Sequence, residues 1–274
     1  MATFLDVGYT TVDGVRIHAR HWVPSGDRGE LAVVLGHGFT GSSASPQVAR
    51  ICQRLSERGF AVLSPDFRGH GRSGGATTAG ELEVLDVAAA VGWLRDAGYA
   101  RVAILGFSMG GSAVLRYAGL PGGQATASDG GRWRPDADAV VSVSSPGMWF
   151  ERGTRPMRVV HWVLEKRTGR AALRVAKRVR VSGRRWDPVP EAPKEVVGAI
   201  GVPLLLIHGD ADHYFPLRHI EALSGAAAAH AEIWIEPGMT HAETGTTPEL
   251  VDRIAAWLRV ALSVPRPAGG PGAV

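Results

Sequence analysis

Residues 101–118 constrain the fold of this chain more than any other stretch. They begin with a short apolar run, 102–105, that has the length and composition of a fully buried parallel strand. A Gly-Phe-Ser-Met-Gly turn follows at 106–110, and the residues after it are typical of the start of a helix. A strand, a G-x-S-x-G turn and a helix in this order hold the serine hydroxyl above the edge of a sheet, where a base and a substrate reach it. We therefore predict that Ser108 is a nucleophile, in a strained turn whose crowding the two glycines relieve.

The same motif occurs a second time at 71–75, around Ser73, so the match alone does not identify the nucleophile. With 36 glycines among 274 residues, G-x-S-x-G arises by chance about once in a few such chains. Ser73 lies well beyond the apolar run at 60–63 and is followed by a stretch rich in Gly, Ala and Thr instead of a helix. The surrounding residues therefore favour Ser108 over Ser73.

The overall composition, with 45% hydrophobic and 20% charged residues, is typical of a soluble globular protein with a sizeable core. No run approaches the roughly 18 apolar residues of a membrane span, and the first residues do not resemble a signal peptide. The single cysteine, Cys52, cannot form an internal disulfide, and we predict that it is a small buried side chain. We expect a cytoplasmic protein that needs neither a metal ion nor another cofactor.

The positive charge of the chain is concentrated in one segment. The formal net charge is +4, but residues 151–186 contain twelve Lys and Arg against two Glu, so this window carries +10 and the rest of the chain −6. Because the basic residues lie in a single segment, we do not expect a nucleic-acid partner; the oligomeric state cannot be read from the sequence.

Elements of two kinds alternate along the chain. A hairpin is predicted around Asp13-Gly14, with His18 and His21 on its solvated surface. After it, apolar runs typical of buried strands alternate with segments of helical periodicity, which predicts a mostly parallel sheet with helices on both faces. We expect a core at 1–144 and 201–264, an inserted helical cap at 145–200 and a disordered tail at 265–274. Strands are predicted at 31–35, 60–63, 102–105, 139–143, 202–208 and 232–236, and helices at 46–58, 81–97, 112–118, 217–223 and 248–262.

A serine hydroxyl becomes a good nucleophile only when a base accepts its proton and a third group orients that base. In a parallel sheet these partners lie in loops that follow later strands. Asp210 and Asp212 follow one late predicted strand, and His241 follows the next. The other candidates for the base are weaker, because His230 precedes a strand and His70 lies in a Gly-His-Gly turn. We predict His241 as the base and leave the acid between the two aspartates.

Several separate motifs occur in an order that resembles the α/β-hydrolase superfamily. They are H-G-F after an early strand, D-x-R-G-H-G-x-S, G-F-S-M-G-G, H-G-D-A-D-x-x-x-P and a late G-x-x-H loop. The resemblance covers nearly the whole chain apart from the insertion and the tail. It implies that Asp212 is the acid, because the family's acid lies a few residues before a proline, here Pro216. It also implies an oxyanion hole made by the backbone N–H groups of Phe39 and Met109.

Two positions separate this chain from other members of the superfamily. Haloalkane dehalogenases and epoxide hydrolases use an aspartate where this chain has Ser108, and haloperoxidase-like members usually carry tryptophan at the position of Phe39. The chain is most similar to cinnamoyl/feruloyl esterases and monoacylglycerol-lipase-like carboxylesterases. The resemblance implies a serine carboxylesterase that acts through an acyl-enzyme on small-molecule esters with small or medium apolar or aromatic acyl groups. A thioesterase, an amidase or aminopeptidase, and a non-catalytic ligand receptor remain alternatives.

In this fold an insertion after the sixth strand lies over the pocket. We predict an apolar helix face at 159, 160, 163 and 164 and another at 172, 175, 176 and 179, with Arg170, Arg174, Lys177 and Arg178 opposite and solvated. Attraction of this basic cap to an anionic surface, an acidic partner or a carboxylated substrate is the alternative interpretation. The apolar residues expected to line a substrate pocket are Met148, Trp149, Phe150, Trp162, Tyr214 and Phe215.

Overall fold

The computed structural model describes residues 3–24, 29–121, 135–227, 229 and 231–264. Most of the glycine-rich stretch at 120–135, the candidate base His230 and the predicted tail at 265–274 therefore lie outside the described residues. None of the described helices has the length and apolar character that crossing a bilayer requires.

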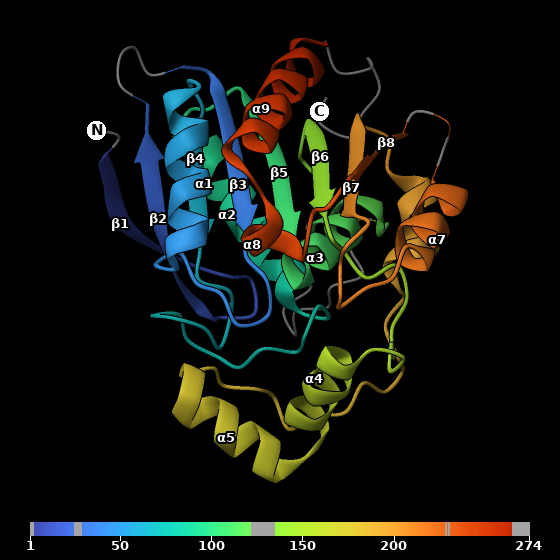
Figure 1. The fold of residues 1–274 in the computed structure, drawn as a ribbon. Helices are drawn as coiled ribbons and strands as arrows, with labels where there is room; N and C mark the ends of the chain where they lie inside the picture. Colours follow the sequence, from blue (N-terminus) through green and yellow to red (C-terminus); the bar gives the residue numbers. More distant parts are fainter. Residues whose placement is uncertain (1–2, 25–28, 122–134, 228, 230, 265–274) are drawn as a thin grey trace.

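The described residues form one eight-stranded sheet in the order β1-β2-β4-β3-β5-β6-β7-β8 (Figure 1). β1 and β2 form the predicted antiparallel hairpin, and β2 pairs antiparallel with β4. All other neighbouring strands are parallel, so the predicted mostly parallel sheet is confirmed. The strands are β1 (Thr3–Thr10), β2 (Arg16–Val23), β3 (Leu31–Gly36), β4 (Ala61–Pro65), β5 (Arg101–Phe107), β6 (Ala139–Val143), β7 (Leu204–Gly209) and β8 (Ala231–Glu236).

Helices cover both faces of the sheet, as the alternating pattern predicted. α1 (Pro46–Glu57) and α9 (Pro248–Ser263) pack on one face, while α2 (Glu83–Asp96), α3 (Met109–Gly119) and α7 (Arg218–Ala226) pack on the other. Side chains alternate between the two faces along β3. Val33 and Leu35 therefore pack under α1 and α9, whereas Ala32 and Val34 pack under α2, α3 and α7. The face of α1 that carries Cys52 is buried as expected.

The insertion forms two helices beyond the end of the sheet at which β5 runs into Ser108 (Figure 1). They are α4 (Arg155–Glu165) and α5 (Arg167–Lys177), and the short helices α6 (Pro193–Val196) and η1 (Val197–Ala199) lead on to β7. Val163, Leu173 and Val179 form a small apolar cluster of their own, against which Phe39 packs.

The apolar face predicted at 172, 175, 176 and 179 is wrong for the three residues within α5, and only Val179, which follows the helix, is buried. The buried residues of α5 are Gly169 and Leu173, whereas Val175 is 84% exposed and both Ala172 and Ala176 are exposed. Within α5, Leu173 is the one large apolar side chain that is buried. A helix with so small an apolar contact does not need a broad apolar stripe. The weakly apolar Ala and Val residues therefore did not indicate the buried side.

Backbone hydrogen bonds fix the segment that follows α5 to a loop of the core. The N–H of Arg180 donates to the Gly69 carbonyl at 2.8 Å, and the N–H groups of Thr77 and Ser182 donate to the carbonyls of Arg180 and Thr77, each at 2.8 Å. Further along, the Arg116 guanidinium of α3 donates to the carbonyl of Glu191 at 2.8 Å. The insertion is thus attached to the core along its length and not only at its two ends.

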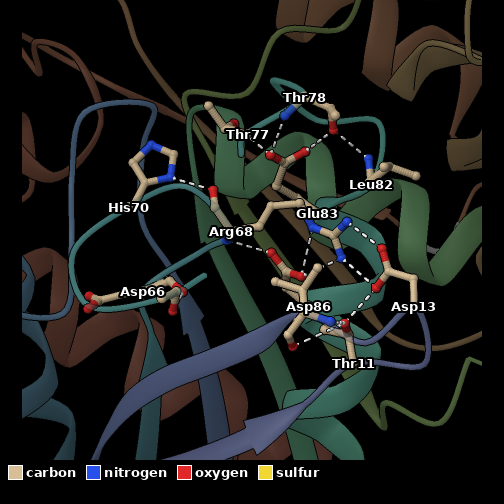
Figure 2. A network of polar contacts seen from close by, with 12 residues as sticks. Thr11, Asp13, Asp66, Arg68, His70, Thr77, Thr78, Leu82, Glu83 and Asp86 are labelled. Carbon is tan, nitrogen blue, oxygen red and sulfur yellow. Dashed lines mark hydrogen bonds and ion pairs between the residues drawn. The ribbon is translucent and has the colours of Figure 1, made fainter. Parts of the chain in front are cut away.

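A buried polar network holds the loop between β4 and α2 (Figure 2). Arg68 is buried, and its guanidinium donates to Asp86 at 2.8 and 2.9 Å and to Asp13 at 2.8 and 3.1 Å. His18 and His21 are not the surface residues that the sequence predicted, and they lie on opposite faces of β2. His18 contacts the Asp66 carboxylate at 3.1 Å. His21 is buried on the face that it shares with Ala19, where its ring packs against Trp93 and Tyr99.

Candidate active site

The turn between β5 and α3 holds Ser108 in a strained conformation. Its backbone has φ 51° and ψ −115°, which an L-residue rarely adopts. The glycines on either side are required by space, since a Cβ on Gly106 would lie 2.2 Å from the Gly110 carbonyl oxygen, and one on Gly110 would lie 2.4 Å from that of Gly36. The N–H of Ser108 donates to the Val143 carbonyl at 2.9 Å, which fixes the turn against β6. Ser108 is largely buried and lines a cavity.

Three side chains that are far apart in the sequence meet at this turn. The Oγ of Ser108 lies 2.9 Å from Nε2 of His241, and the Nδ1 of His241 lies 2.7 Å from Oδ2 of Asp212. The second carboxylate oxygen, Oδ1, accepts hydrogen bonds from the N–H groups of Tyr214 and Phe215 at 2.8 and 3.0 Å. Burial opposes the charge on Asp212, but these bonds outweigh it and hold the pKa of this carboxyl below its ordinary value. The geometry matches a nucleophile, a base and an orienting carboxylate.

The rejected candidates have other partners. Asp210 accepts a hydrogen bond from the N–H of Gly238 at 2.6 Å. Ser73 is buried, and its Oγ donates to the Asp66 carbonyl. His70 contacts the carbonyl oxygen of Phe39 at 2.5 Å. Each of these residues holds a loop near the site, and none of the three contacts Ser108.

The loop that carries His241 is held by a serine that sequence reasoning missed. The N–H of Ala242 donates to Oγ of Ser144 at 3.1 Å, and both residues have positive φ, 49° and 51°. The imidazole of His241 stacks on the ring of Tyr214 with centroids 4.3 Å apart, and the Phe215 ring lies 5.5 Å away. These contacts fix the plane of the imidazole, so it faces Ser108 and Asp212 at once.

Phe39 and Met109 line the same cavity as Ser108, and Met109 directly follows it in the sequence. Within the described residues neither of their backbone N–H groups donates a hydrogen bond. Because backbone N–H groups in proteins nearly always have an acceptor, these two amides are candidates for binding an oxygen atom of a ligand.

A second residue that the sequence did not indicate is Glu243, two positions after His241. The N–H of Gly38 donates to its Oε1 at 2.6 Å. A Cβ on Gly38 would lie 3.2 Å from the other carboxylate oxygen and 3.4 Å from Cβ of Ser108, so these three residues are immediate neighbours. Burial raises the pKa of the Glu243 carboxyl, although the hydrogen bond from Gly38 acts in the opposite direction. Glu243 therefore holds the peptide that precedes Phe39.

On its other side this loop is held by His37. Its Nδ1 lies 2.8 Å from the Gly38 carbonyl oxygen, and its Nε2 accepts a hydrogen bond from the N–H of Phe67 at 3.0 Å. Burial lowers the pKa of His37 to about 3. The ring is therefore neutral, with its proton on Nδ1, and it links the loop to the end of β4.

A cavity of about 1200 Å³ opens above Ser108 and extends beneath α4 and α5. Of the predicted pocket residues, Met148, Trp149, Phe150, Tyr214 and Phe215 line it. Trp162 does not line it and is 45% exposed, so this prediction is wrong. The cavity face of α4 carries Met157, Val160, His161 and Leu164, which are spaced by three and four residues, and Trp162 falls outside that row.

The basic side chains of α5 are divided between two surfaces. Arg170 and Lys177 line the cavity, whereas Arg174 and Arg178 do not. The prediction that all four lie on a solvated outer face is therefore wrong for Arg170 and Lys177. They lie three positions before and four positions after the buried Leu173, so they share its side of the helix.

Comparison with known proteins assigns this chain to a fold family. Residues 32–173 match the model of the alpha/beta hydrolase fold family. A monoacylglycerol lipase of Mycolicibacterium smegmatis is 29% identical, over 91% of this chain and 95% of the lipase. A non-heme chloroperoxidase of Streptomyces lividans is 31% identical, over 81% of this chain and 70% of that protein.

Among solved structures, the esterase Pf2001 of Pyrococcus furiosus superposes with a TM-score of 0.72 at 22% identity, over 95% of this chain and 92% of the esterase. The fold of this chain thus recurs at low sequence identity. The chain belongs to the alpha/beta hydrolase fold family and resembles its esterase- and lipase-type members.

Proposed function

We propose that this chain is a serine carboxylesterase with a Ser108–His241–Asp212 catalytic triad. The observation that carries the proposal is the continuous relay of hydrogen bonds, 2.9 and 2.7 Å long, that ends at a serine on the floor of a cavity. The similarity to a monoacylglycerol lipase supports ester hydrolysis as the reaction.

In this mechanism the Oγ of Ser108 attacks the ester carbonyl while Nε2 of His241 accepts the hydroxyl proton. His241 then gives that proton to the alcohol oxygen, which leaves, and the acyl group remains on the serine. A water molecule attacks the acyl-enzyme with His241 again as the base, and the acid is released. Asp212 stays charged throughout, because its pKa is lowered, and it stabilises the protonated imidazole.

The negative oxygen of each tetrahedral intermediate binds the N–H groups of Phe39 and Met109. Two preorganised amides in a cavity sheltered from water stabilise this charge more than bulk water does. Glu243 acts one step away as a positioning residue, because it binds the N–H of Gly38 and so orients the peptide that carries the Phe39 amide.

Residues 145–200 act as a small helical cap that selects the substrate. The apolar part of the cavity, formed by Met148, Trp149, Tyr214 and Phe215, fits an acyl group of small or medium size, including an aromatic one. Of these side chains, Tyr214 and Phe215 pack against the imidazole of His241. They support a small-molecule ester as the substrate.

Hydrolysis of 4-nitrophenyl esters of increasing acyl length tests the proposal. We expect Ser108→Ala to lower kcat by about 10³-fold or more, because the covalent step is lost while binding remains. A fluorophosphonate probe should label Ser108 in the wild-type protein and leave Ser73 unlabelled. The matched control is Ser182→Ala, since this serine also lines the cavity but does not contact His241. Hydrolysis at the wild-type rate by folded Ser108→Ala would refute the proposal, and an inert wild-type protein that still binds esters would favour a receptor.

A further inference from the structure

One side of α5 presents positive charge to the cavity. Lys166, Arg170 and Lys177 all line it, and they follow one another at intervals of four and seven residues, which places them on one side of the helix. Leu173 lies on the same side and belongs to the apolar cluster against which Phe39 packs. The row of cations therefore runs above the loop that contributes the Phe39 amide.

These cations have few anionic partners. In the part of the chain that the structure describes, Lys166, Arg167 and Lys177 line the cavity and form no ion pair. Arg170 donates to the carbonyl oxygens of Leu164 and Glu165 at 2.9 and 3.1 Å and so caps the C-terminus of α4. These partners are backbone carbonyls without a formal charge, so they do not neutralise the guanidinium. Among the described residues, the inner side of the cap therefore carries cations that no carboxylate neutralises.

The carboxylates that line the cavity are already bound elsewhere. Glu151 pairs with Arg218 and His219, and Glu165 pairs with Arg152 and His161. Glu243 accepts the N–H of Gly38 on the far side, next to the serine. A ligand that enters the cavity therefore meets unpaired cations under α5 and no unpaired anion beside them.

Apolar side chains line the same cavity as Ser108 and these cations. They are Met157, Val160 and Leu164 of α4, together with Phe39 and Trp149. A ligand that fills the cavity thus meets the serine, an apolar surface and a group of cations. These three kinds of surface fit an amphiphilic ester that carries a negative charge.

We propose that the natural substrate is an ester that carries a carboxylate or phosphate at the end remote from the scissile bond, bound by Lys166, Arg167 and Lys177. The inference rests on the proposed esterase function and adds a substrate class to it. A small molecule is favoured over an anionic surface because these cations line a concavity, while Arg174 and Arg178 lie outside it.

Paired substrates that differ only in charge test the inference. On the acyl side they are the mono-4-nitrophenyl ester of adipic acid and the matching ester of adipic acid monoamide, with succinate and suberate pairs to vary the length. On the alcohol side they are the butyrate esters of 6-hydroxyhexanoate and of 6-hydroxyhexanamide. In at least one arm we expect the charged ester to have a kcat/KM about tenfold higher than its neutral partner, since partly exposed ion pairs contribute up to about fivefold each.

The double variant Lys166→Gln/Lys177→Gln keeps part of each side-chain stem and removes both charges. We expect it to abolish most of that preference while kcat/KM for the neutral ester stays within about twofold. The matched control is Arg174→Gln/Arg178→Gln, which removes the same charge from outside the cavity and should leave the preference intact. Salt at about 0.5 M should weaken the preference in the wild type by screening.

Three results would overturn the inference. The wild type would hydrolyse charged and neutral esters equally in both arms, or the control pair would lower the preference as much as the lysine pair, or the lysine pair would leave it unchanged. Hydrolysis of the neutral esters in any of these cases leaves the esterase function standing. A wild-type protein that hydrolyses no ester in either arm overturns both proposals at once.

Discussion

The contact between Glu243 and Gly38 predicts a defined loss of catalysis when the carboxyl group is removed. Glu243→Ala leaves the N–H of Gly38 without the acceptor that now lies 2.6 Å away. A buried donor left without an acceptor costs about 1–3 kcal/mol. If that cost is borne in the transition state, when the Phe39 amide must hold a negative oxygen, kcat falls by about 5- to 150-fold.

The conservative variant separates hydrogen bonding from charge. Glu243→Gln keeps a carbonyl oxygen that can accept the hydrogen bond from Gly38 and removes the negative charge of the ionised carboxyl group. We therefore expect its kcat to remain within about threefold of wild type. Because the affected amide acts on a charge that exists only in the transition state, the alanine variant should lower kcat and leave KM nearly unchanged.

The assay is steady-state hydrolysis of a neutral 4-nitrophenyl ester, with thermal melting to show that each variant is folded. Glu249→Ala is the matched control, since this exposed glutamate lies at the start of α9 away from the cavity. A folded Glu243→Ala protein with wild-type kcat would refute the reasoning. So would a glutamine variant as impaired as the alanine variant, because the loss would then not depend on the acceptor for Gly38.

Asp212→Asn should lower kcat by about 10³-fold or more. Asp210→Asn keeps an acceptor for the N–H of Gly238 and should lower kcat by less than about threefold. If Asp210→Asn lowered the rate of ester hydrolysis more than Asp212→Asn, the acid would be misassigned. Phe39→Pro removes an amide N–H and should lower kcat by about 10²–10³-fold. Phe39→Ala keeps that N–H and removes a side chain that lines the cavity, so it should change mainly KM. Circular dichroism and thermal melting must first show that both variants are folded. Burial lowers the pKa of His37 to about 3, from 6.5 in the unfolded chain, so its contribution to stability is complete above pH 6.5 and is lost as the pH falls toward 3. Urea unfolding should show that His37→Gln flattens the decline between pH 6.5 and pH 5 by about 2 kcal/mol, and an unchanged slope would contradict the assignment.

The fold and the positions of Ser108 and His241 near one sheet edge were predictable because their determinants are local. Central parallel strands are buried on both faces, so they appear as unbroken apolar runs such as β5 and β7. Ser108 stands in a five-residue motif between an apolar run and a helical segment, and His241 follows a late predicted strand. The choice of Asp212 over Asp210 depended instead on the resemblance to the superfamily, whose acid lies a few residues before a proline.

The supporting residues were not predictable, because their roles exist only after folding. Glu243 and Gly38 are 205 residues apart, and Ala242 and Ser144 are 98 residues apart. Neither the spacing of residues nor the composition of the sequence indicates that two such distant residues form a hydrogen bond. The positions at which the two loops meet are set by strand order, which single residues do not encode.

The error on α5 has a different cause. The rule that a helix turns its apolar side inward assumes that the interior is a packed core. α5 lies over a cavity instead, so Arg167, Arg170 and Lys177 line that cavity while Val175 faces solvent. Trp162 was assigned to the pocket for a related reason, since a large aromatic side chain in a cap suggests a binding surface. Helical register, and not residue type, decides which side chains reach the cavity.

The backbone pairing of residues 180–182 with the loop at 69–77 has a consequence for how molecules are selected. A cover hinged at its ends would admit ligands of many shapes and then close, and part of the binding free energy would be spent on ordering it. Here residues 180–182 are hydrogen-bonded to the core, so we expect an opening of fixed cross-section that excludes oversized ligands before they reach Ser108. Substitutions on the inner sides of α4 and α5 should therefore change the shape and lining of the cavity, while the sheet and the residues around Ser108 stay as they are. The preference of such an enzyme can diverge quickly among relatives that share one catalytic apparatus.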